Sequence, residues 1–270
     1  MPEAPVFKVD AFTEDPFSGN PAAVCVMPTG LDDALYVRIA EELNISETAF
    51  LEERPDGSYD LRWFSPVREV PLCGHGTLAT AHALFNDLGY KGDRVTFNTK
   101  SGKLYAARSE KGITLDFPRN DPFKVAAPEG VLEALGVENA EEVEYSDTNQ
   151  KLVVCVPTWD DVASLKPNYA ALLAAKNTLG WRGFIVTAPG RGSYDFVSRY
   201  FAPFMGVNED PVTGSAHTVL APYWAKRLGK KRMHAYQASA RGGVLDVELT
   251  DERILLTGKA VTVLKGTLVY

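Results

Sequence analysis

The chain has 270 residues, 45% hydrophobic and 23% charged, a composition typical of a globular protein with room for two domains. Its 28 basic and 35 acidic residues give a net charge of −7, so neither nucleic acid nor an anionic membrane surface is an expected partner. No apolar run reaches transmembrane length, and the N-terminus lacks the pattern of a secretory signal. Three scattered cysteines, Cys25, Cys73 and Cys155, fit neither a disulfide framework nor the spacing of a zinc site. These features predict a reduced, cytoplasmic protein.

The first half of the chain alternates short strands with two helices. Turn-bounded apolar runs predict strands at 6–11, 22–27, 47–52, 59–64, 94–98, 103–108 and 113–117. Helices are predicted at 31–43 and 77–88. The second helix carries apolar residues around most of its circumference, which is typical of a helix buried on nearly all sides. This half is therefore predicted to be an α+β domain in which a mixed sheet curls around a central helix.

The second half repeats this order after a break. Residues 119–130 combine proline with polar residues and are predicted to link an N-terminal half, 1–118, to a C-terminal half, 131–259. Residues 260–270 form a further strand without a counterpart in the first half, so we expect this strand to return and complete the N-terminal half. Within the C-terminal half, one helix is expected at 217–228 and strands at 151–156, 183–187, 196–201, 234–238, 244–249 and 254–256.

One motif occurs twice, and its glycine-containing part recurs after 140 residues. Each copy ends at a glycine, Gly74 or Gly214, that precedes a predicted helix. A single turn of this kind could serve only to begin a core helix. Two turns at matched positions favour a shared site, in a cleft between the halves, where the free N–H groups of the first helical turns hold an anion. The two copies are Arg62–Pro66 with Glu69–Thr77 and Arg199–Pro203 with Glu209–His217.

Two polar residues directly follow these glycines. His75 comes after Gly74, where the helix dipole is expected to disfavour the charged imidazole and leave a neutral donor and acceptor. Ser215 comes after Gly214 and could act either as a helix N-cap or as a hydroxyl that binds substrate. The plain alternative for His75 is a packed or surface histidine. His217, further along the second helix, is expected to be structural.

Two carboxylates complete the candidate set. Asp210 lies just before the second glycine turn, where its counterpart is Val70, and its plain alternative is to cap the turn before Pro211. Glu47 lies between a helix end and an apolar strand. From spacing alone it is a solvated edge residue, whereas burial would raise the pKa of its carboxyl and suit it to take and return a proton.

The motifs together resemble the phenazine-biosynthesis isomerase (PhzF-like) family across essentially the whole chain. Within that family the chain is most similar to the phenazine biosynthesis-like domain-containing proteins. The resemblance implies a diaminopimelate epimerase-like fold of two pseudo-symmetric domains, and homodimers are usual in the family. The motifs that carry it are Asp10–Thr13, Phe17–Val24, Ser46–Phe50, Arg62–Phe64, Leu72–Thr77, Arg199–Pro203 and Glu209–His217, with Gln237 and Arg241–Gly243 near the end.

The resemblance also implies a function. In the family, a cofactor-free isomerisation moves a proton on a small carboxylic acid, and one glutamate carries that proton. Carried over to this chain, Glu47 is the acid/base, and His75, Asp210 and Ser215 match the other polar residues of the catalytic set. No metal and no cofactor are implied. The residues expected to bind substrate are Asn20, Cys73, Gly74, Gly76, Thr213 and Gly214.

Two alternatives remain open. The segment Cys73–Thr77 also resembles the first motif of proline racemases and hydroxyproline epimerases, which use two facing cysteines. The 140-residue register places Thr213 opposite Cys73, which disfavours a two-thiol epimerase, but a Cys/Thr pair resembles the related trans-3-hydroxyproline dehydratases. The second alternative is a non-catalytic member that binds a small ligand or a protein.

Overall fold

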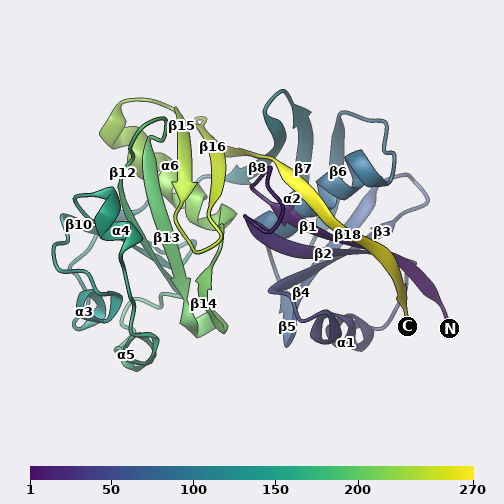
Figure 1. The fold of residues 1–270 in the computed structure, drawn as a ribbon, viewed down its shortest axis with the longest axis horizontal. Helices are drawn as coiled ribbons and strands as arrows, with labels where there is room; N and C mark the ends of the chain where they lie inside the picture. The colour runs from purple at the N-terminus through teal and green to yellow at the C-terminus, as the bar shows by residue number, and fades with distance from the viewer. The chain divides into compact units, whose positions relative to one another are not determined.

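The computed structural model describes all residues, 1–270, and divides into two compact units. Unit 1 comprises Met1–Phe117 together with Leu256–Tyr270, and unit 2 comprises Pro118–Leu255. Each unit has its own central helix, α2 (Gly74–His82) in unit 1 and α6 (Gly214–Leu228) in unit 2, visible in Figure 1. None of the helices combines the length and apolarity needed to span a bilayer.

Unit 1 is a mixed sheet with one terminal strand from each end of the chain. The strand order is β18–β1–β2–β3–β4–β6–β7–β8, with β5 paired to β4, and only the β2/β3 and β4/β6 pairs are parallel. A π-helical turn, Ala83–Asp87, extends α2. The other elements are β1 (Glu3–Ala11), β2 (Asn20–Met27), α1 (Asp33–Leu43), β3 (Glu47–Glu53), β4 (Tyr59–Ser65), β5 (Arg68–Val70), β6 (Arg94–Thr99), β7 (Gly102–Ser109), β8 (Gly112–Pro118) and β18 (Ala260–Val269).

Unit 2 repeats this topology. The order is β9–β10–β11–β12–β13–β15–β16, with β14 paired to β13, and only β11/β12 and β13/β15 are parallel. A 3₁₀ turn, Pro203–Met205, follows β13. The other elements are β9 (Phe123–Lys124), α3 (Val131–Leu135), β10 (Glu142–Ser146), β11 (Lys151–Cys155), α4 (Trp159–Ala163), α5 (Tyr169–Ala174), β12 (Gly183–Pro189), β13 (Phe196–Ala202), β14 (Val207–Asp210), β15 (Arg232–Gln237), β16 (Gly243–Leu249) and β17 (Arg253–Gly258), which runs on into unit 1.

Strand pairing defines which residues of the two units are equivalent. In unit 1, β2 runs parallel to β3 with Ala22 opposite Glu47, and in unit 2, β11 runs parallel to β12 with Lys151 opposite Gly183. Ala49, two residues after Glu47, pairs with Trp63 on the next strand of unit 1. Ile185, two residues after Gly183, pairs with Tyr200 on the next strand of unit 2. The register therefore equates Ala22 with Lys151, Glu47 with Gly183, and Trp63 with Tyr200.

The central helices are buried as the sequence predicts. Every residue of α2 from His75 to Ala81 is buried, because small and apolar side chains cover the whole circumference. Burial of aromatic side chains stabilises each unit by about 1.5–3 kcal/mol per residue. Under α1, the rings of Tyr36, Phe50 and Phe64 contact one another with centroids 4.6–5.5 Å apart.

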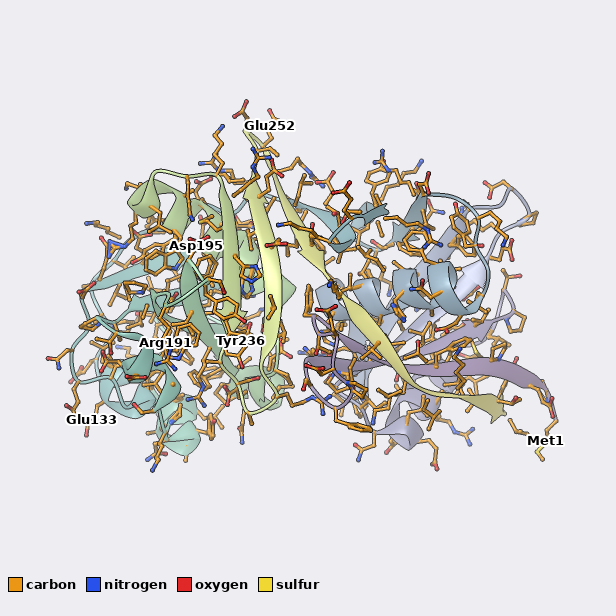
Figure 2. All side chains as sticks on the ribbon, turned by 45° about the horizontal axis from the view of Figure 1, so that its top comes forward. Met1, Glu133, Arg191, Asp195, Tyr236 and Glu252 are labelled. Carbon is orange, nitrogen blue, oxygen red and sulfur yellow. The ribbon has the colours of Figure 1, made fainter.

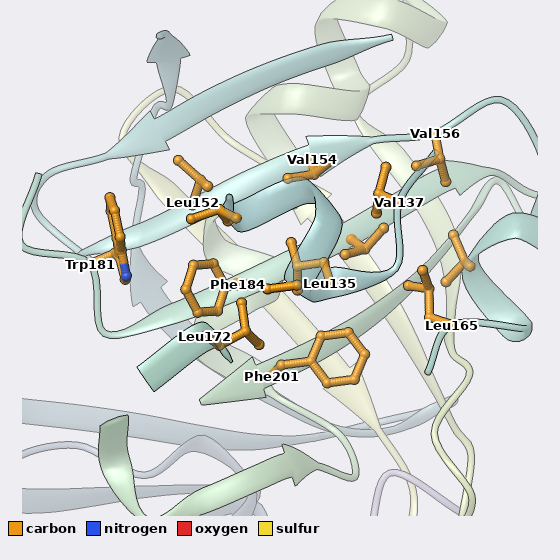
Figure 3. Packing of buried hydrophobic residues seen from close by; sticks show 14 of the residues in the cluster. Leu135, Val137, Leu152, Val154, Val156, Leu165, Leu172, Trp181, Phe184 and Phe201 are labelled. Atoms are coloured by element: carbon orange, nitrogen blue, oxygen red, sulfur yellow. The ribbon is translucent and has the colours of Figure 1, made fainter. Parts of the chain in front are cut away.

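Unit 2 has an aliphatic and aromatic core of its own. Figure 3 shows Leu135, Leu172, Phe184 and Phe201 packed together between α3, α5 and the sheet. The ring of Trp159 lies between Arg191 and Tyr236, two residues labelled in Figure 2. The Arg191 guanidinium lies 4.7 Å from the Trp159 ring centroid, and the Tyr236 ring stacks on it at 5.5 Å. These contacts hold α4 against the sheet.

The predicted central helices and strands are observed, with ends shifted by a few residues. The short helices α3 to α5 and the strand β10 were not predicted, because each has only five or six residues and shows too little periodicity. Segment 119–130 contains the short strand β9. The three cysteines are free and buried.

Candidate functional site

A carboxylate and an imidazole meet at the N-terminus of α2. Glu47 is the first residue of β3, and His75 is the second residue of α2. The turn into β3 is made by Asn44, which ends α1 in the left-handed conformation at φ 47°. As a result, Glu47 Oε2 lies 3.2 Å from His75 Nε2, with the Glu47 side chain 19% exposed and that of His75 6% exposed.

Cys73 supplies a thiol to the same cluster. It is the N-cap of α2, and its Sγ accepts a hydrogen bond from the Gly76 amide at 3.3 Å. The same sulfur lies 3.6 Å from Nδ1 and 3.7 Å from Nε2 of His75. Gly76 permits this packing, since a Cβ there would lie 2.8 Å from Trp63 Cδ1 and 3.0 Å from Cys73 Sγ. The buried Trp63 Nε1–H has no hydrogen-bond partner.

Asn20 fixes the other side of the imidazole. Its Nδ2 lies 3.1 Å from His75 Nδ1, and both side chains are buried. The ring Nε2–H donates to Glu47 Oε2, and the Asn20 carboxamide contacts Nδ1 on the other side of the ring. Asn20, Glu47, Cys73 and His75 are called the unit 1 set below.

The electrostatics of this set correct two expectations. Burial acts to raise the pKa of the Glu47 carboxyl, but the hydrogen bond and charge of His75 outweigh it, and the pKa lies below its ordinary value. Burial acts to lower the pKa of His75, yet the Glu47 carboxylate 3.2 Å from its Nε2 holds that pKa above its usual range. The prediction of a neutral His75 is therefore wrong, because the carboxylate of Glu47, which comes from a distant strand, outweighs the effect of the helix dipole. Burial raises the pKa of the Cys73 thiol, so the protonated thiol predominates at neutral pH.

The second helix N-terminus carries a different set. Asp210 ends β14, and its Oδ2 accepts a hydrogen bond from Thr213 Oγ1. Gln237 holds the turn in place, since its Oε1 accepts from the Thr213 amide at 2.8 Å and its Nε2 donates to the Asp210 carbonyl at 2.7 Å. Thr213 is the N-cap of α6, so the interpretation of Ser215 as the N-cap is wrong. Ser215 lies in the first turn, where its carbonyl accepts from Asn149 Nδ2 at 2.7 Å.

A buried lysine completes this second set. Lys151 begins β11 and donates through Nζ to Asn149 Oδ1 at 3.0 Å, and the same Nζ lies 5.2 Å from the ring centroid of Tyr200. Burial lowers the pKa of its amine to about 8, although the charge of Asp210 opposes the fall. The residues Asn149, Lys151, Asp210, Thr213, Ser215 and Gln237 are called the unit 2 set below.

The predicted site residues thus fall into two groups, one in each unit. Unit 1 brings together Asn20, Glu47, Cys73, His75 and Gly76, with Gly74 beginning the helix. Unit 2 brings together Asp210, Thr213 and Ser215, with Gly214 beginning the helix. His217 is fully buried, and its Nδ1 donates to the Thr213 carbonyl at 2.8 Å, which fits its expected structural role.

Sequence reasoning missed Asn149, Lys151 and Tyr200. Asn149 lies two residues before Lys151, as Asn20 lies two residues before Ala22, and each asparagine contacts the second residue of its central helix. This correspondence between the two halves is the signal that could have found Asn149. Lys151 carried no such signal, because the equivalent residue is alanine.

Comparison with known proteins agrees with the fold and the motifs. The family described as phenazine biosynthesis-like protein matches residues 9–266. An uncharacterized isomerase of Pseudomonas aeruginosa is 48% identical over 266 residues, covering 98% of this chain and 99% of that protein. Phenazine biosynthesis-like domain-containing protein 1 of Mus musculus is 46% identical over 283 residues, covering 98% of each. A crystal structure of a PhzF-family protein from Enterococcus faecalis has a TM-score of 0.93 and 41% identity, with both chains fully covered.

These similarities extend over nearly the whole chain and include both central helices and their N-terminal turns. The diaminopimelate epimerase-like architecture expected from the sequence, with two similar units around central helices, is confirmed. The chain belongs to the phenazine biosynthesis-like (PhzC-PhzF) family.

Proposed function

We propose that this protein is a cofactor-independent isomerase that moves a proton on a small cyclic or amino carboxylic acid, with Glu47 as the acid/base. One observation carries the proposal. The partly exposed carboxylate of Glu47 lies 3.2 Å from a buried histidine at a helix N-terminus, and the equivalent position of unit 2 is a glycine. The chain therefore has one such base, not a symmetric pair. Membership of a family with members named isomerases supports the same reaction class.

The proposed reaction has two steps. Glu47 takes a proton from a carbon of the substrate, and the electron pair of the broken C–H bond delocalises into the conjugated system as an enolate. Glu47 then returns the proton to another carbon, where the new C–H bond forms. Once Glu47 is protonated, the positive charge of His75 has lost its carboxylate partner and stabilises the anionic intermediate.

Helix N-termini are suited to hold the substrate carboxylate, because the first amides of a helix have no partner within it. The amides at Gly74 and His75 are the ones assigned here. Asp210 and Ser215 are assigned to the catalytic set because their motif matches that of the family. A homodimer and a cytoplasmic location remain predictions.

The test is hydrogen exchange in heavy water. Small cyclic and amino carboxylates are first screened for thermal stabilisation of the protein, and C–H exchange of the binders is then followed by NMR. Glu47→Gln should reduce the exchange rate by about 10²–10⁴-fold, the usual contribution of a general acid/base. Glu144→Gln is the matched control, since Glu144 is a buried strand carboxylate of unit 2 outside both sets. Wild-type exchange in Glu47→Gln would refute the assignment.

The dehydratase alternative differs from the proposed isomerase in requiring Cys73 as a catalytic residue. A Cys/Thr enzyme needs a thiolate, whereas burial holds the Cys73 thiol in its protonated form, and the Thr213 hydroxyl already donates to Asp210. If Glu47 is the catalytic base, Cys73→Ser should therefore keep the rate of C–H exchange within a few-fold of wild type. If the protein is a dehydratase, the same substitution should abolish its activity. Ligand binding without any exchange would support the non-catalytic alternative.

A further inference from the structure

A pocket of unit 2 lies between β10 and the last turns of α6, and none of its lining residues belongs to the unit 1 set or the unit 2 set. Its volume is about 330 Å³, which is at the lower end of the range for pockets that hold small molecules. β10 contributes Glu142 and Glu144, which are two residues apart on a strand and therefore point to the same face of the sheet. α6 contributes Tyr223, Lys226 and Arg227. The strand thus supplies carboxylates to the pocket, and the helix supplies cations.

Most of the charged groups that line this pocket are already paired. Glu142 accepts from Lys124 Nζ at 2.5 Å and from Arg227 Nη1 at 3.0 Å. Asp121, a further carboxylate of the lining, pairs with Arg119 at 2.5 Å. These ion pairs account for all but two of the charged groups in the lining.

Glu144 is one of the two. The residue is only 7% exposed, and no hydrogen bond or ion pair reaches its carboxylate. Burial and the charge of Glu142 raise the pKa of this carboxyl above its ordinary value, and the charge of Lys226 opposes the rise. An unpaired carboxylate is costly to bury, so its place in the lining favours a ligand that brings a positive charge.

Lys226 of α6 is the other. Its side chain is exposed and makes no ion pair. Its charge acts on Glu144 although the two side chains are not in contact, so the pocket holds an unpaired cation and an unpaired anion close to one another. The rings of Pro122, Pro222 and Tyr223 line the same pocket and supply apolar surface. This lining complements a ligand that carries both charges and an apolar group.

We propose that this pocket binds an α-amino acid with an apolar side chain, in its zwitterionic form. The α-ammonium donates to the Glu144 carboxylate, the α-carboxylate accepts from Lys226 Nζ, and the side chain packs on Pro122 and Pro222. Both contacts are charge-assisted hydrogen bonds, which are roughly twice as strong as neutral ones. A metal ion fits less well, because the ion pairs of Glu142 leave one free carboxylate, whereas Ca²⁺ takes about six to eight oxygen ligands. The binding does not rest on the proposed function.

The test is calorimetric titration of the full chain with L-leucine and with two analogues, L-leucinamide, which lacks the carboxylate, and isocaproate, which lacks the amine. We expect L-leucine to bind about 10-fold or more tighter than either analogue. Glu144→Gln keeps the size of the side chain and removes its charge, and it should weaken L-leucine binding by about 10–100-fold. Lys226→Gln should weaken the binding by about 10-fold. Because Lys226 is exposed, this second variant keeps the test valid if the buried substitution disturbs folding.

Lys176→Gln is the matched control, because Lys176 is an exposed lysine of unit 2 outside the pocket, and it should bind L-leucine as wild type does. Equal affinity of wild type and Glu144→Gln, equal affinity for L-leucine and L-leucinamide, or no binding of L-leucine overturns the proposal. Glu47→Gln separates the pocket from the proposed active site, since binding through Glu144 should persist in that variant. If L-leucine binds through Glu144 but no carboxylate shows exchange, the pocket stands and the proposed function fails.

Discussion

The two units share one topology but differ at the residues that surround their central helices. In unit 1 the first residue of β3 is Glu47, whose carboxylate faces His75. In unit 2 the first residue of β12 is Gly183, and a Cβ there would lie only 2.2 Å from the Tyr200 hydroxyl. An aromatic ring therefore occupies the space that the carboxylate occupies in unit 1.

On the neighbouring strand, β2 or β11, unit 2 has the larger and polar side chain. Ala22 in unit 1 corresponds to Lys151 in unit 2, so unit 2 has gained a buried amine where it lacks a carboxylate. A buried amine with a depressed pKa costs stability, which natural proteins usually tolerate for function. The comparison teaches that a duplicated scaffold has diverged, with a carboxylate–imidazole contact in unit 1 and a buried lysine under the charge of Asp210 in unit 2.

The strongest test of this comparison is to place a side chain at position 183. Gly183→Ala should lower the free energy of unfolding of unit 2 by about 3 kcal/mol, the upper end of the usual cost of overpacking, because the new methyl group overlaps the buried ring of Tyr200. The measurement is urea denaturation followed by tryptophan fluorescence. Gly266→Ala is the control, since a Cβ at this strand glycine would approach no atom closer than 3.7 Å. Equal stability of the two variants would show that Tyr200 does not fill the position of Glu47.

The next test concerns the buried amine. The Lys151 pKa falls from 10.5 to about 8 on folding, which corresponds to a destabilisation of about 3 kcal/mol at most. Because the folded state binds fewer protons than the unfolded state between these values, stability should rise with pH from about 8 to 10.5. Below pH 8 the destabilisation is fully present.

Lys151→Met removes the destabilisation caused by burial of the amine. We expect the variant to gain stability relative to wild type at pH 7, by about 2–3 kcal/mol, and to lose that advantage as the pH approaches 10.5. Urea denaturation of both proteins at pH 7, 8.5 and 10 measures the difference, in which the titration of other groups cancels. A difference that does not change with pH would mean that Lys151 is charged in the folded state throughout. If Lys151 also serves the proposed substrate, the stabilised variant should bind carboxylates less well.

The sequence reveals the duplication but identifies only some of the residues that correspond between the two halves. The fixed spacing of 140 residues correctly aligns the helix N-termini at Gly74 and Gly214, because the segments 69–77 and 209–217 that contain them have equal lengths. It fails on the strands. Strand pairing equates Glu47 with Gly183, 136 residues apart, and Ala22 with Lys151, 129 residues apart. Loops of different length shift the register, and only hydrogen bonding between strands restores it.

The charge state of His75 could not be predicted from the sequence for a related reason. The helix dipole is visible in sequence as the glycine turn before α2, and it disfavours an imidazolium. The carboxylate that reverses this preference arrives from β3, and no local pattern indicates its approach. The central helices and the longer strands were therefore predictable, whereas the N-cap at Thr213 and the contacts between distant strands were not.

The smallest predicted effect concerns the one ion pair that both units keep. Arg62 binds Glu69 through two hydrogen bonds of 2.8–2.9 Å, and Arg199 binds Glu209 through two of 2.7–2.8 Å. The third nitrogen differs. In unit 1 it contacts Asp33, whose side chain is 66% exposed. In unit 2 it donates to carbonyls at the end of α4, with the Leu165 oxygen at 2.9 Å.

Lysine keeps the charge of either arginine but cannot fill all three contacts. Arg199→Lys leaves partly buried helix-end carbonyls without a donor, whereas Arg62→Lys leaves an exposed carboxylate that water can solvate. We therefore expect Arg199→Lys to destabilise the protein by about 1 kcal/mol more than Arg62→Lys, measured as the difference in urea midpoints. An equal loss would mean that the bidentate carboxylate contact alone accounts for both arginines. The units would then be alike at this position, and their divergence would be confined to the residues around the central helices.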